Sequence, residues 1–105
     1  MTPDEYTKWV VTQDLYPQNA HSLALYGLGL TGEAGEVAEK IKKLYRDDTW
    51  HGPAAICKEL GDVVWYATRI AEKCGFTLQD VMDANVAKLT DRNARGVSRG
   101  SGDNR

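Results

Sequence analysis

The chain has 105 residues, with 13 Lys and Arg against 15 Asp and Glu, which gives a formal net charge of −2. An acidic chain of this size predicts one domain and argues against nucleic acid as the main partner, because phosphate-backbone binding relies on an excess of cationic side chains. The sequence has no apolar run of membrane-spanning length and no basic and apolar N-terminal signal region. We therefore expect a cytoplasmic protein without a membrane partner.

The first predicted element is a short helix. The sequence Thr2-Pro3-Asp4-Glu5 is typical of a capping box with Pro at the first helical position. The helix is expected to run to about residue 14, and Pro17 and Asn19 then indicate a loop. Its predicted buried residues are Tyr6, Trp9 and Val10.

Three further helices follow, because the apolar residues recur at spacings of three and four and not of two. They are predicted over about residues 22–46, 53–75 and 77–96. The helix over 53–75 is expected to end at Gly75 in a left-handed cap, and Thr77-Leu78-Gln79-Asp80 is a capping signature at the start of the next helix. The fold class is thus all-α, with one domain over residues 1–96. The tail, residues 97–105, is rich in Gly, Ser and Arg and is expected to be disordered.

Two acidic doublets stand out, Glu33-x-x-Glu36 and Glu59-x-x-Asp62, one on each of two consecutive helices. Side chains three residues apart lie on one helix face and can reach the same ion. The short connection at residues 47–52 predicts an antiparallel hairpin. In that hairpin Glu36 is expected opposite Asp62, with all four acids within roughly 10 Å along its length.

Four neighbouring carboxylates predict a divalent cation, because their mutual repulsion would otherwise return protons to some of them. Oxygen ligands without His or Cys favour Mg²⁺, Mn²⁺ or Ca²⁺ over zinc. The alternative is a pair of solvated helix faces, neutralised by lysines. The nearby lysines are Lys40, Lys42, Lys43 and Lys58. A matched doublet on each of two facing helices favours the metal site.

Several residues flank the predicted site. Lys40 and Lys43 project near the acidic face, where they either neutralise the acids or contact substrate. Tyr66 is expected level with Glu33, to bond a carboxylate or border a substrate pocket. Three glycines in the second predicted helix lack side chains, so a neighbouring helix or a phosphate could approach its backbone closely. These are Gly29, Gly32 and Gly35.

The fourth helix carries Asn85, Lys88 and Arg92 at i, i+3 and i+7. This donor-rich row suits a polyphosphate, since phosphates held by a metal need cationic donors on their other side. It also fits an ordinary amphipathic edge with long cationic side chains along it. A neighbouring metal site would favour the first interpretation.

These residues together resemble a known family. The sequence is similar to MazG-type nucleoside triphosphate pyrophosphohydrolases in two runs, Gly32–Val37 and Glu59–Tyr66. The similarity includes Lys42 and Lys43 between these runs, and Asn85 and Lys88-Leu89-x-x-Arg92 after them. Most of residues 20–93 is covered, and the compact single-domain form is similar to phage-like and bacterial members. The resemblance implies a four-helix bundle built around the antiparallel hairpin, and a homodimer or homotetramer.

The resemblance also implies an activity. This is Mg²⁺-dependent hydrolysis of nucleoside or deoxynucleoside triphosphates to the monophosphate and pyrophosphate, with Mn²⁺ as an alternative ion, for nucleotide-pool control or house-cleaning. By the match, the metal ligands are Glu33, Glu36, Glu59 and Asp62. Glu36 or Glu33 would accept the proton of the attacking water. The expected substrate-binding residues are Lys43, Tyr66, Asn85, Lys88 and Arg92.

A second hypothesis is a non-catalytic helical module, in which the acids bind only a structural cation or a partner helix. It predicts metal binding without triphosphate turnover, and it leaves the row on the fourth helix without a purpose. A di-iron carboxylate site is excluded on its ligands, because such sites use Glu-x-x-His and this chain has no such pair.

Overall fold

The computed structural model describes residues 1–48 and 52–96. Its four helices are α1 (Pro3–Gln13), α2 (Ser22–Asp47), α3 (Pro53–Lys73) and α4 (Leu78–Arg95). The described part of the chain contains no strand, so the all-α prediction is confirmed. The expected tail and residues 49–51 of the hairpin connection lie outside the described residues.

Local sequence signals account for the helix ends. Thr2 and Thr77 each form a complete capping box, with Glu5 and Asp80 as the respective reciprocal partners. Gly75, directly after the α3 cap, has φ of 88°, a backbone conformation in which a side chain would be strained. The predicted caps are therefore confirmed at these three positions.

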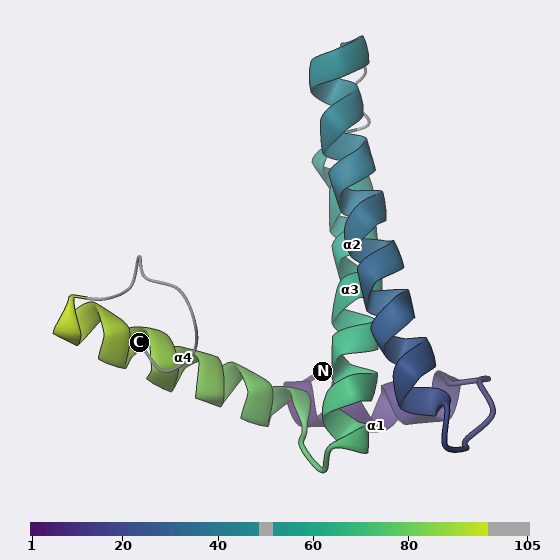
Figure 1. Ribbon diagram of the computed structural model, residues 1–105, viewed down its shortest axis with the longest axis vertical. Coiled ribbons are helices and arrows are strands. Elements are labelled where there is room, and N and C mark those ends of the chain that lie inside the picture. The colour runs from purple at the N-terminus through teal and green to yellow at the C-terminus, as the bar shows by residue number, and fades with distance from the viewer. Residues whose placement is uncertain (49–51, 97–105) are drawn as a thin grey trace.

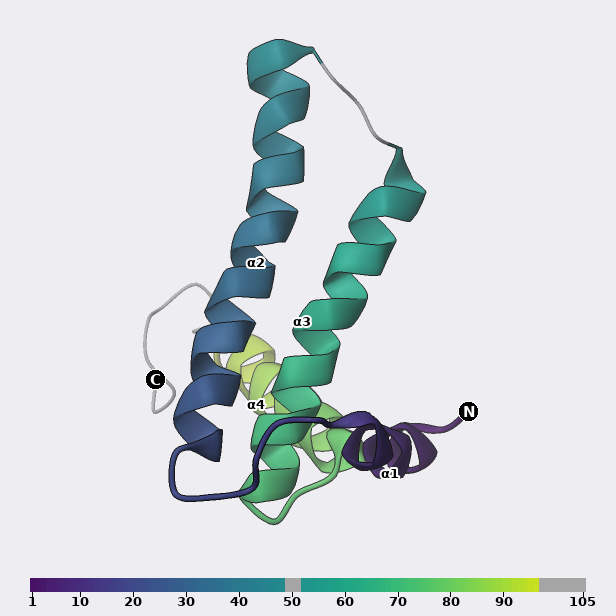
Figure 2. The ribbon, with the colours of Figure 1, turned by 90° about the vertical axis from the view of Figure 1, so that its right-hand side faces the viewer.

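Helices α2 and α3 form the predicted antiparallel hairpin (Figure 2). The chain as a whole is L-shaped, because α1 and α4 cross the foot of the hairpin and α4 extends away from it (Figure 1). The Cα radius of gyration is 16.3 Å, against about 13 Å for a compact domain of 100 residues. The four helices and the central hairpin are those that the resemblance implies, and in the single chain they have this open arrangement.

A buried threonine anchors α4 at the foot of the hairpin. The Thr7 hydroxyl accepts a hydrogen bond from the backbone N–H of Leu78 at 2.9 Å and donates one to the carbonyl of Pro3 at 2.9 Å. Within the described residues α4 packs against α1 and α3 but not against α2. We call the foot of the hairpin together with α1 and the loop after it, residues 3–26 and 68–80, the elbow.

The apolar core is small. Among the described residues, the buried hydrophobic side chains are Val10, Tyr26 and Ala71. Trp9, predicted to be buried, is 43% exposed, because among the described helices α1 packs on α3 and α4 and leaves its outer face to solvent. None of the helices in the described ranges is long and apolar enough to cross a membrane.

Candidate metal centre

Three carboxylates converge in the middle of the hairpin. Glu33 of α2 and Glu59 and Asp62 of α3 each offer an oxygen, and these atoms all lie within 4.8 Å of one another. We call these three residues the acidic cluster. Glu33 and Glu59 are half-buried, and Asp62 is exposed. A donor set made only of carboxylate oxygens suits a hard divalent cation.

The electrostatics of the acidic cluster are unfavourable without a cation. Burial raises the pKa of Glu33, and the negative charges of Asp62, Glu59 and Glu36 raise it further. Glu36 is exposed and is not one of the three clustered carboxylates. The α2 residue that meets Asp62 is thus Glu33, one helical turn from the register expected from the sequence.

Lysines follow the acidic cluster along α2. The Lys40 ammonium lies 3.6 Å from a carboxylate oxygen of Glu59, and both side chains are half-buried. Lys43 lies nearer to Glu39 and Asp47. The pKa of each of these acids is lowered first by a hydrogen bond, from Lys42 and from Arg46 respectively, and then by neighbouring positive charges that include Lys43. The structure therefore places Lys40 beside the cluster and Lys43 further along the hairpin.

A cavity of about 270 Å³ opens at the cluster and is lined by Glu33, Asp62, Trp65 and Tyr66. Tyr66 and Glu33 thus line the same cavity, although Tyr66 lies opposite Gly29, one helical turn from the expected position level with Glu33. Tyr66 lies directly over Gly29, where an added Cβ would stand 2.2 Å from the Tyr66 ring. Of the three glycines expected to allow a close approach, Gly29 alone does so, since nothing lies within 4 Å of a Cβ at the other two.

The pKa of the Tyr66 hydroxyl is raised to about 12. The first cause is a hydrogen bond with the Tyr16 hydroxyl, followed by burial and by the charges of Tyr16, Glu33 and Asp62. Tyr66 therefore faces the acidic cluster as a neutral phenol that can donate a hydrogen bond.

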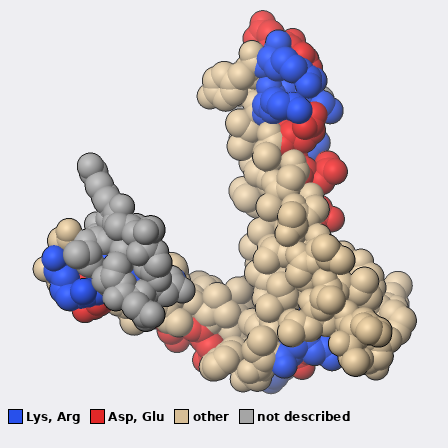
Figure 3. Space-filling view, viewed as in Figure 1, with Lys and Arg blue, Asp and Glu red and all other residues tan. Residues whose placement is uncertain are grey.

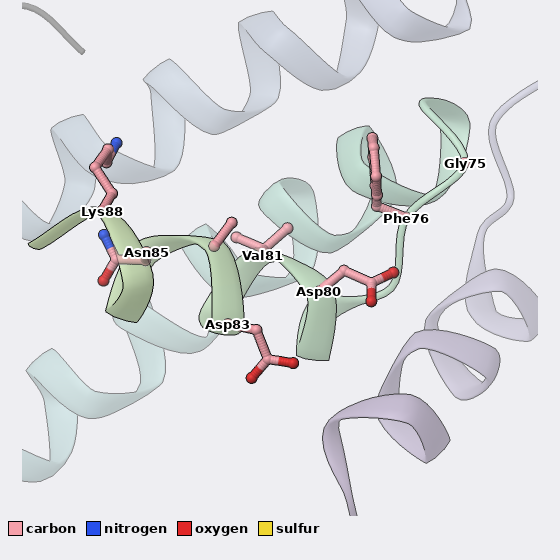
Figure 4. A pocket seen from close by; sticks show the side chains of 8 residues that line it. Gly75, Phe76, Asp80, Val81, Asp83, Asn85 and Lys88 are labelled. Atoms are coloured by element: carbon pink, nitrogen blue, oxygen red, sulfur yellow. The ribbon is translucent and has the colours of Figure 1, made fainter. Parts of the chain in front are cut away.

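The row on α4 lies elsewhere. Asn85 and Lys88 line a separate, larger cavity of about 660 Å³ that continues to Phe76 and Gly75 (Figure 4). Arg92 is buried near the C-terminal end of α4. Because α4 does not pack on α2 within the described residues, one chain does not bring this row to the acidic cluster. The larger cavity lacks the converging carboxylates, so the smaller one is the better candidate for chemistry.

Comparison with known proteins identifies the family. The model of the MazG nucleotide pyrophosphohydrolase domain matches residues 19–97. The Gene 37 protein of Mycobacterium phage L5 is 44% identical over 87 residues, which cover 79% of this chain and 76% of that protein. No solved structure gives a significant match.

The chain belongs to the MazG nucleotide pyrophosphohydrolase domain family. The matched region contains the acidic cluster and all of α4, but it begins after α1 and most of the loop that follows α1. In this MazG domain, that preceding loop nevertheless reaches the wall of the acidic cavity.

This connection was missed from the sequence. The Tyr16 hydroxyl lies 2.8 Å from that of Tyr66, and Asp14 accepts a hydrogen bond from Arg69 at 2.7 Å. One signal was available, since Asp62, Tyr66 and Arg69 stand at i, i+4 and i+7 on one face of α3. No local pattern, however, links Arg69 to a carboxylate 55 residues away.

Proposed function

We propose that this MazG domain hydrolyses nucleoside triphosphates, deoxynucleotides among them, to the monophosphate and pyrophosphate with Mg²⁺. The observation that carries the proposal is the acidic cluster, three carboxylate oxygens within 4.8 Å, in a chain of this family. The biological role would be control or cleaning of the nucleotide pool, in the cytoplasm where free nucleotides are found.

The residues fit a divalent cation. Glu33, Glu59 and Asp62 supply only oxygen donors, and Mg²⁺ typically takes a few carboxylates and completes its octahedron with water and phosphate oxygens. The raised pKa of Glu33, due to burial and to three neighbouring acids, reflects an excess of negative charge that a cation would relieve. When bound, the metal would neutralise phosphate charge and make a coordinated water more acidic.

The chain itself would hold substrate and move the proton. With the cluster carboxylates committed to the cation, Glu36 is the nearby carboxylate that remains to accept the proton of the attacking water. Tyr66, on the cavity wall, would donate a hydrogen bond to a phosphate oxygen.

We further propose that a second copy of the chain completes the site. Large apolar side chains are exposed, including Leu28 of α2 at 72%, Val86 of α4 at 63% and Phe76, between α3 and α4, at 57%. Figure 3 shows that the lower half of the hairpin is largely uncharged on this face, whereas charges gather at the far end of the hairpin, along the lower edge of the molecule and at the outer end of α4. Exposed apolar surface on this scale favours association. In a homodimer or homotetramer, α4 of one chain would bring Asn85 and Lys88 to the triphosphate held by its neighbour.

The test compares Glu59→Gln with Glu39→Gln, an isosteric change on α2 outside the acidic cluster. Pyrophosphate release from a panel of NTPs and dNTPs is measured with Mg²⁺, with Mn²⁺ and with a chelator. We expect Glu59→Gln to lose activity at least about a hundredfold and Glu39→Gln to retain it. Metal binding without turnover of any triphosphate would instead support the non-catalytic helical module.

A further inference from the structure

The elbow contains a buried arginine that the proposed reaction does not use. Arg69 is 2% exposed, and its guanidinium bonds Asp14 at 2.7 Å and Glu72 at 2.7 Å. It also donates to Gln18 at 3.3 Å and to the Tyr26 hydroxyl at 3.2 Å. A charge in the interior requires such partners, because an unpaired one would be strongly destabilising. Arg69 thus ties the loop after α1 to both hairpin helices.

Asp14 is the point where this network fixes the loop. One carboxylate oxygen takes the hydrogen bonds of Arg69 and the Tyr26 hydroxyl. The other oxygen accepts a hydrogen bond from the backbone N–H of Tyr16 at 2.8 Å. The backbone of Tyr16 is therefore held by an ion pair whose two side chains are each 2% exposed.

The side chain of Tyr16 connects this network to the acidic cavity. Its ring packs edge-on against that of Tyr26, with centroids 5.9 Å apart, and its hydroxyl bonds the Tyr66 hydroxyl at 2.8 Å. Tyr66 is then enclosed by Gly29 beneath its ring, by Trp65 edge-on at 5.0 Å and by the Tyr16 hydroxyl. Of these three, only Tyr16 fixes the position of the Tyr66 hydroxyl.

We propose that Tyr16 is a positioning residue: it holds the Tyr66 hydroxyl at the wall of the acidic cavity, and the buried Arg69–Asp14 ion pair holds Tyr16. This inference rests on the proposed function, since Tyr66 is the residue that would touch substrate. Tyr16 acts only through Tyr66, so the loop before the matched region sets the geometry of a site made by α2 and α3.

The kinetic test is a double-mutant cycle of Tyr16→Phe and Tyr66→Phe, with Tyr45→Phe as control. Tyr16 is 38% exposed and Tyr45 is 83% exposed, so each substitution removes a hydroxyl and keeps an accessible ring. We expect each of the first two variants to lower kcat/KM about five- to tenfold, the range of one hydrogen bond. The double variant should be no worse than the more impaired single variant, and Tyr45→Phe should match the wild type.

Tyr16→Phe with wild-type kcat/KM, or a double variant whose loss is the product of the single losses, would overturn the inference. Melting temperatures of all variants are measured alongside. A purely structural role for Tyr16 would lower the melting temperature without this non-additive pattern in the kinetics.

A second readout does not depend on turnover. Trp65 becomes the sole tryptophan in a Trp9→Phe, Trp50→Phe background, and its emission reports on Tyr66 because the two rings are in contact. Tyr16→Phe should shift this emission, whereas Tyr45→Phe should not, and an unchanged spectrum would overturn the inference. If the wild type releases no pyrophosphate, the proposed function fails, and the Trp65 spectra alone decide the role of Tyr16.

Discussion

Two carboxylates in this chain show opposite responses to their surroundings. Burial alone would raise the pKa of Asp14, but hydrogen bonds from Tyr26, from the Tyr16 backbone and from Arg69 outweigh it and hold that pKa below its usual range. The pKa of Glu33 is raised by burial and by three neighbouring acids. The elbow therefore supplies the cation and donors that its carboxylate needs, while the acidic cluster has an excess of negative charge. The first region is a structural network, and the second is suited to an external cation.

The largest effect should come from breaking the elbow network. Asp14→Ala leaves the buried Arg69 without its principal carboxylate, and we expect the free energy of unfolding to fall by about 3 kcal/mol or more. Asp4→Ala, at an exposed position of α1, is the control and should have little effect. Urea denaturation measures both. If the free energy of unfolding falls by less than about 1 kcal/mol in Asp14→Ala, the Arg69–Asp14 network is not a main source of stability.

The second prediction concerns the acidic cluster and Lys88 of α4, which one chain does not bring together. Glu59→Gln and Lys88→Met chains, each expected to be weakly active alone, are refolded together at equal amounts. If a dimer pairs the cluster of one copy with α4 of the other, half of the assemblies are mixed and each has one intact site, so about a quarter of wild-type activity should return. Mixtures no more active than the single variants would place Lys88 and the cluster in the same chain.

The third prediction uses the opposite pKa directions. Asp14, with its lowered pKa, contributes stability that is present above its unfolded pKa of about 3.9 and is lost as pH falls through the folded value. Glu33, with its raised pKa, has the reverse sign, so stability is lost as pH rises from about 4.3 through its folded value.

Glu33→Gln should therefore raise the melting temperature of the metal-free protein at pH 7 and leave it nearly unchanged at pH 4. Mg²⁺ should raise the melting temperature of the wild type more than that of this variant. Thermal melts with a chelator and with Mg²⁺ provide the measurement. If metal-free Glu33→Gln melts at a lower temperature than the metal-free wild type at pH 7, the acidic cluster does not hold an excess of negative charge.

The smallest effect is expected at Lys40. Its ammonium, 3.6 Å from Glu59, partly neutralises the cluster and competes with a metal ion. Lys40→Met should strengthen Mn²⁺ binding about two- to fivefold, the range of a partly exposed ion pair. Lys42→Met is the matched control, because Lys42 pairs with Glu39 outside the cluster. Calorimetric titration measures both, and weaker binding by Lys40→Met would show that Lys40 supports the cation site.

Much of the fold could be predicted from local sequence. The capping boxes at Thr2 and Thr77 and the glycine after α3 set the helix ends through interactions within a few residues, and all were found where expected. The acidic doublets were predicted to face each other for the same reason, since helical spacing and a short connection fix which faces meet. Three of those four acids do converge.

The rest depends on contacts that periodicity does not contain. The sequence does not single out Arg69, since a charged residue at helical spacing from Glu72 is typical of a surface, whereas its burial depends on Asp14 in a distant loop. The position of α4 depends on its packing against α1 and α3, which includes the hydrogen bond between Leu78 and Thr7 across 71 residues. An amphipathic pattern shows that α4 has an apolar face but not which helix covers it.

The central claim is that the acidic cluster supports hydrolysis of a triphosphate to pyrophosphate. The most direct test is ³¹P NMR of a deoxynucleoside triphosphate incubated with Mg²⁺ and either the wild type or Glu59→Gln. We predict monophosphate and pyrophosphate resonances for the wild type and unchanged substrate for the variant. Formation of a diphosphate and orthophosphate, or equal product from both proteins, would contradict the account.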